Sequence, residues 1–67
     1  MNNLKEINLK LEKKNNKNFK FNMIKDKKKY ILMCENIETG KRFEVRRYNY
    51  LPDYDILRDE IFDRCLG

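Results

Sequence analysis

The stretch YILMCENIETGKRFEVRRY (residues 30–48) decides the fold that we predict for this chain of 67 residues. It begins with a nearly continuous apolar run, as in a buried strand, and ends with a second strand-like run, FEVRRY. The ETGK segment between them is typical of a turn, in which Gly40 supplies a positive φ. A three-residue loop with a bulge at Gly40 is the expected hairpin connection. This loop predicts the cross-strand pairs Ile31–Arg47, Met33–Val45 and Ile37–Lys41.

Upstream of this hairpin, residues 7–12 and 19–23 alternate between apolar and polar side chains. A period of two residues is typical of half-buried strands. The polar run between them, residues 13–18, has the composition of a turn. The sequence therefore predicts a second hairpin that closes across this Lys/Asn loop.

Downstream, Leu51 and Pro52 end the sheet, and Asp53 is a suitable residue for a helix N-cap. Helical spacing then puts four residues on one apolar face: Tyr54, Leu57, Ile61 and Cys65. The predicted fold class is α+β, with a small antiparallel sheet of about four strands (two hairpins) and one C-terminal amphipathic helix packed on it. Residues 1–67 are expected to form a single domain, frayed over residues 1–3.

The side-chain inventory argues against an enzyme. The chain lacks His and Ser, so neither a Ser–His nor a Cys–His pair can form. A domain of this size also has a thin core, with little room for an enclosed substrate pocket. Cys34 and Cys65 lie far apart, with no CxxC motif and no His to complete a zinc site. We expect no catalysis, no cofactor and no metal.

Several features predict where the protein acts. Met1 is followed by polar and charged residues rather than by a signal peptide. Each cysteine lies in an apolar run, where a thiol behaves as a small hydrophobe, which favours free thiols in a reducing compartment. No apolar stretch approaches the roughly 20 residues of a membrane span. These features predict a cytoplasmic protein of a bacterial host that makes no membrane contact.

Charge is distributed unevenly along the chain, although the net charge is +5. Residues 51–67 carry two basic and five acidic residues, a net charge of −3, and residues 1–50 carry a net charge of +8. Such asymmetry bears on partners rather than on fold. The lysine and asparagine runs have a second explanation, because both residues have AT-rich codons that a low-GC genome accumulates.

Two surfaces are candidates for binding a partner. The first is an acidic face of the C-terminal helix, which would mimic phosphates and dock into a basic groove; the alternative is an ordinary solvated face. Its residues are Asp55, Ile56, Asp59, Glu60 and Asp63.

The second candidate is a basic and aromatic hairpin surface, suited to phosphate contact and base stacking or to a protein interface. Its residues are Lys41, Arg42, Arg46, Arg47, Tyr48 and Tyr50. The alternative for these arginines is cross-strand pairing with Glu35 and Glu44.

In size, charge and lack of a catalytic set, the chain resembles the small anti-defence proteins of phages and mobile elements, such as anti-CRISPR proteins. This resemblance implies an inhibitor that sterically blocks a nucleic-acid-handling machine, with a protein or ribonucleoprotein complex as its partner. Residues 28–66 also resemble, in topology, the arm-type DNA-binding domains of tyrosine integrases. That second resemblance implies direct nucleic-acid binding by the basic hairpin. Exposed strand edges make a homodimer a further expectation.

Overall fold

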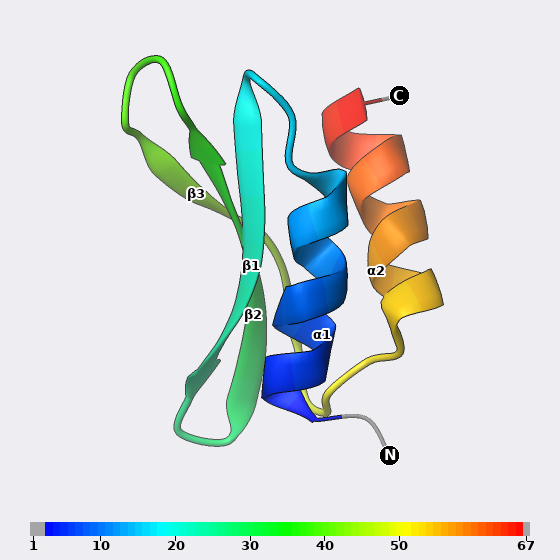
Figure 1. Ribbon diagram of the computed structural model, residues 1–67. Coiled ribbons are helices and arrows are strands. Elements are labelled where there is room, and N and C mark those ends of the chain that lie inside the picture. The colour runs from blue at the N-terminus through cyan, green and yellow to red at the C-terminus, as the bar shows by residue number, and fades with distance from the viewer. Residues whose placement is uncertain (1–2, 67) are drawn as a thin grey trace.

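The computed structural model describes residues 3–66, and the side chains of residues 3–64. The elements follow in the order α1 (Leu4–Leu11), η1 (Glu12–Lys14), β1 (Phe19–Asp26), β2 (Lys29–Asn36), β3 (Arg42–Tyr48), α2 (Tyr54–Ile61) and η2 (Phe62–Leu66). The strands form one antiparallel sheet in the order β1-β2-β3. Both helices lie on the same side of this sheet, which leaves its other face open (Figure 1). The fold is thus a small α+β structure with a helix at each end.

The prediction of about four strands and a single C-terminal helix is wrong, because residues 7–12 belong to α1 and η1. Their apolar residues fit both periods: Ile7 and Leu11 are four apart and fully buried, whereas Leu9 between them is 54% exposed. A local signal favoured the helix. Asn3 occupies the N-cap and its Oδ1 accepts a hydrogen bond from the Glu6 N–H at 2.9 Å, the bond by which an asparagine N-cap stabilises the first turn of a helix. Residues 1–2 of the segment predicted to fray lie outside the described residues.

The predicted hairpin across residues 13–18 is also wrong, because that loop joins a helix to β1. β1 pairs instead with β2, and the two-residue connection Lys27–Lys28 links the paired Asp26 and Lys29. The stretch 26–29 was predicted to end the strand, but the pairing across it was not predicted, because the connection contains neither glycine nor proline.

The β2–β3 hairpin confirms the prediction in its strands but not fully in its register. Ile31 lies opposite Arg47, as predicted, whereas Met33 lies opposite Glu44 rather than Val45. The irregularity lies within the strands, between Leu32 and Met33 of β2, instead of at the turn. A bulge shifts every pair on one side of it by one residue. The predicted register is therefore kept where Ile31 lies opposite Arg47, and it is lost from Met33 to the β2–β3 turn.

The core lies between the helices and the sheet. It contains Ile7, Leu11, Phe21, Met23, Leu32, Cys34, Tyr48, Leu57 and Ile61. Leu57 and Ile61 confirm the predicted apolar face of the C-terminal helix, whereas the side chain of Cys65 lies outside the described residues. No helix within residues 3–66 is long and apolar enough to cross a membrane.

Asparagine side chains cover the outer edge of β1. Alternate backbone N–H groups of the strand, at Phe19, Phe21 and Met23, each donate to an asparagine Oδ1 at 2.6–2.8 Å. The acceptors are Asn16, Asn15 and Asn8 respectively. The Asn8 Nδ2 group also donates to the Met23 carbonyl oxygen at 3.0 Å, so this one side chain binds β1 as a neighbouring strand would. These contacts satisfy a strand edge that would otherwise be open to pairing with another chain.

The β1–β2 turn holds a lysine in a conformation that favours glycine. Lys27 has a φ of 57°, and it is the one non-glycine residue with positive φ in the described chain. Left-handed backbone costs a residue with a Cβ about 1–2 kcal/mol. Lysine therefore occupies this turn at the expense of local stability.

Replacing Lys27 by glycine is expected to raise the free energy of unfolding by about 0.5 kcal/mol, because relief of the backbone strain exceeds the added entropy of the unfolded chain. Chemical denaturation followed by circular dichroism measures the change. Lys28→Gly is the matched control: its φ is ordinary, so glycine there should lower stability by about 0.5–1 kcal/mol. Equal effects of the two substitutions would contradict the assignment of strain to Lys27.

Candidate functional site

The structure divides the predicted basic hairpin surface between the two faces of the sheet. Arg42 and Arg47 lie on the open face, opposite Glu35 and Ile31 of β2. Arg46 lies on the face toward the helices, where its Nη1 is 3.2 Å from the Glu60 Oε2 of α2. Lys41 and Tyr50 are exposed just beyond the two ends of β3. The six residues therefore do not form one continuous surface.

Tyr48 packs in the core and presents no ring face for base stacking. It is 6% exposed, with the Arg46 guanidinium 5.5 Å from its ring centroid and Tyr50 edge-on at 6.0 Å. Its hydroxyl is buried without a hydrogen-bond partner among the described residues. Burial raises the pKa of Tyr48, and the nearby Glu60 carboxylate raises it further. Tyr48 thus secures β3 against α2.

The arginines of β3 are engaged by carboxylates. Arg42 Nε lies 2.9 Å from Glu35 Oε1, across the two strands, as the alternative interpretation of the hairpin predicted. Arg47 Nη2 lies 2.9 Å from Glu44 Oε1 within the same strand, and this contact raises the pKa of Arg47. Exposed pairs of this kind contribute little stability, but they lower the positive potential that these arginines offer to a phosphate.

The predicted acidic face of α2 is likewise partly neutralised. Arg58 lies between two of its carboxylates: its Nη1 is 3.4 Å from Asp55 Oδ1, and its Nε is 3.6 Å from Asp59 Oδ1. Glu60 points to β3 and η2, where it pairs with Arg46 and Arg64, and its side chain is only 13% exposed. What remains on the outer side is the exposed Asp63 with two exposed apolar side chains: Ile56 at 43% and Phe62 at 63%.

Lysine, rather than arginine, carries the free positive charge of this protein. Within the described residues each of the five arginines has a carboxylate within 4.0 Å, whereas none of the eleven lysines does. The charges of the five paired arginines and of their five carboxylate partners cancel. The net charge of +5 therefore comes from the eleven lysines and the six other carboxylates. The candidate site is therefore the lysine surface, which was left outside the two predicted surfaces because codon bias explained it equally well.

Seven lysines gather at the two ends of β1. We call Lys13, Lys14 and Lys17 the loop cluster, since they lie in η1 and the loop before β1. We call Lys25, Lys27, Lys28 and Lys29 the turn cluster, since they surround the β1–β2 turn. In Figure 1 the two clusters belong to opposite ends of the long β1 arrow, beside α1. All seven are exposed except Lys14, which is half-buried.

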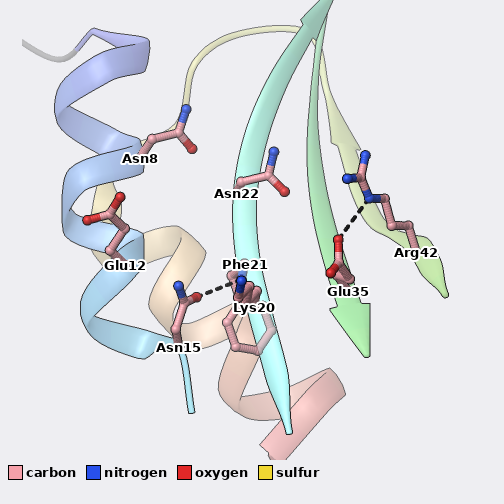
Figure 2. Close-up of a pocket in the computed structure, with 8 residues that line it drawn as sticks. All are labelled: Asn8, Glu12, Asn15, Lys20, Phe21, Asn22, Glu35 and Arg42. Atoms are coloured by element: carbon pink, nitrogen blue, oxygen red, sulfur yellow. Dashed lines mark hydrogen bonds and ion pairs between the residues drawn. The ribbon is translucent and has the colours of Figure 1, made fainter. Parts of the chain in front are cut away.

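A polar depression of about 390 Å³ lies between the two clusters, where α1 meets the edge of β1. Figure 2 shows Asn8, Glu12 and Asn15 on the helical side, and Lys20 and Asn22 on the strand. The Arg42–Glu35 pair closes its far side. The lining holds three asparagine amides, the Lys20 ammonium group and two carboxylates, Glu12 and Glu35. Its amide and ammonium N–H groups are donors suited to phosphate and sugar oxygens.

In comparisons with known proteins, no family model matches this chain, and no curated protein or solved structure matches it significantly. The function is therefore inferred from the geometry of this chain alone.

Proposed function

We propose that this protein is a small non-catalytic module that binds nucleic acid directly, through lysine contacts to the phosphate backbone. The observation that carries the proposal is the division of charge: arginines are paired within the fold, and lysines are left without carboxylate partners. A lysine ammonium binds phosphate as a flexible point charge and requires no fixed fork geometry. Such a surface recognises the charge of the backbone rather than the base sequence.

Salt dependence tests this proposal. Five lysine–phosphate contacts predict a slope of about −4.5 for log K against log[salt], which is about a 500-fold loss of affinity between 50 and 200 mM salt. Fluorescence anisotropy with labelled DNA and RNA measures it.

The matched variants compare lysines with arginines. Lys25→Gln with Lys28→Gln is expected to reduce the slope by about 2, whereas Arg42→Gln with Arg47→Gln should leave it nearly unchanged. Absence of any binding at 50 mM salt would refute the proposal.

A second candidate is an inhibitor, resembling phage-encoded anti-CRISPR proteins, that sterically blocks a nucleic-acid-handling machine of the host. The exposed Phe62 and Ile56 beside Asp63 support it, because an aromatic anchor with a charged rim suits a protein interface. With a purified guide-RNA-loaded nuclease as the probe, the wild-type protein would block cleavage. Phe62→Ser with Asp63→Asn would restore cleavage, and unchanged inhibition by that variant would exclude this surface. Either function belongs in the cytoplasm of a bacterial host.

A further inference from the structure

We infer that the nucleic acid bound by this protein is a double helix, and that the loop cluster and the turn cluster contact the phosphates of one duplex at two points along it. This inference rests on the proposed function and adds the class of ligand. It follows from the spacing of the clusters, the surface between them and the conformation of the turn.

The spacing between the clusters is fixed by a strand. β1 has eight residues, which at about 3.3 Å per residue separates its ends by about 23 Å. The strand is held along its whole length by β2 on one side, and from Phe19 to Met23 by the asparagine contacts on the other. A rigid spacing suits a ligand whose phosphates are also rigidly spaced. One turn of a duplex, about 34 Å long, presents phosphates of both strands within this distance.

The open face of the sheet lacks the aromatic platform that a single strand requires. Proteins that bind single strands stack the bases on exposed aromatic rings. The strands place no aromatic side chain on the open face of the sheet. The side chains that alternation puts on this face are Lys20, Asn22 and Ile24 of β1, Ile31, Met33 and Glu35 of β2, and Arg42, Glu44 and Arg47 of β3. The aromatic ring nearest the turn cluster, Tyr30, is half-buried beneath Lys25, whose Nζ is 5.6 Å from the ring centroid. The exposed aromatic rings, Phe43, Tyr50 and Phe62, lie off this face, near the ends of β3 and on η2. The open face therefore offers contacts to phosphates rather than stacking surfaces for bases.

The turn conformation favours the same ligand. Lys27 occupies a left-handed position in which glycine would be relaxed, and strained residues of this kind cluster at functional sites. Keeping lysine there places three consecutive ammonium groups, at residues 27–29, on the narrow end of the sheet. A narrow tip with several positive charges can approach a groove and contact the phosphates on both of its sides.

The experiment compares duplexes of different length, and a single strand matched in charge to the longer duplex, by fluorescence anisotropy at 100 mM salt. The probes are a 12-bp duplex and a 6-bp duplex, each closed at one end by the same hairpin loop so that it stays paired, and a single strand with about as many phosphates as the longer duplex. At 3.4 Å per base pair the duplexes span about 40 and 20 Å, so only the longer one reaches both clusters. We expect the 12-bp duplex to bind about tenfold or more tightly than either other probe.

The variants test whether both clusters act on one ligand. Lys13→Gln with Lys17→Gln, and Lys25→Gln with Lys28→Gln, are each expected to weaken 12-bp binding about tenfold and to bring it close to 6-bp binding. The control is Lys5→Gln with Lys10→Gln, which removes the same charge from exposed positions of α1, outside both clusters. The control should change 12-bp affinity less than about twofold.

The outcomes separate this inference from the proposed function. The inference of a duplex bound by both clusters is wrong if the single strand binds as tightly as the 12-bp duplex. It is also wrong if the loop-cluster variant binds the duplex as the wild type does. In both cases the proposal of nucleic-acid binding stands. If none of the probes binds at 50 mM salt, both are wrong. Far-UV circular dichroism confirms that each variant is folded, which is expected because the substituted lysines are exposed.

Discussion

Replacement of Leu11 by alanine is expected to lower the free energy of unfolding by about 2–5 kcal/mol. Leu11 is fully buried at the end of α1, in the cluster that joins both helices to the sheet. Its truncation removes apolar contacts and leaves a cavity that a domain with so few core residues cannot refill. A domain of this length has a total stability of about 3–10 kcal/mol, so most of the cooperative stability would be lost.

The matched control lies on the same helix. Leu9→Ala makes the same chemical change at a side chain that is 54% exposed, and it should alter stability by no more than about 0.5 kcal/mol. Urea denaturation of both variants gives the comparison. This pair also tests the correction of the fold, because a strand over residues 7–12 would place Leu9 and Leu11 on one face and make the two substitutions similar. Similar losses would therefore contradict α1.

Asn8→Ala is expected to destabilise the protein by about 1–3 kcal/mol, because it removes the partners of both the N–H and the carbonyl group of Met23. A gain of a few tenths of a kcal/mol in helix propensity offsets part of the loss. The freed edge of β1 should also pair with a second copy of the chain, so we expect concentration-dependent association in sedimentation velocity.

Asn22→Ala is the control for this edge. Asn22 lies on β1 and lines the same depression, but its exposed side chain makes no hydrogen bond within the described residues. Its removal should change stability by less than about 0.5 kcal/mol and leave the protein monomeric. Association of the Asn22→Ala variant, or a monomeric Asn8→Ala variant of full stability, would show that Asn8 does not protect the edge.

The elements that the sequence predicted well are those in which local signals agree. In the β2–β3 hairpin an apolar run, a Gly40 turn and a second run all favour the same structure. For α2, Pro52, the N-cap position of Asp53 and the helical spacing of the apolar residues also favour one structure. The N-terminal segment was mistaken because Ile7 and Leu11 satisfy a period of two as well as a spacing of four, and the cap at Asn3 was overlooked.

The candidate site could not be obtained from residue types alone. Arg42, Arg46 and Arg47 appear in the sequence as a basic patch, but whether each is free depends on a carboxylate brought to it by register or by packing. The partner of Arg46 is Glu60, fourteen residues away on α2. The bulge inside β3 settles which arginines share a face, and no local sequence signal marks its place.

By itself the sequence determined the net positive charge, the lack of a Ser–His or Cys–His pair, the central hairpin and the amphipathic C-terminal helix, since composition and short-range spacing are sufficient for these. The tertiary structure alone decided which charges are free and which edge is closed. Ion pairs and strand pairing join residues distant in the chain, so the arginines became paired, the asparagines covered β1, and the lysines were left at its two ends. The physical reason is that a charge acts according to its neighbours in space, and those neighbours are set by packing.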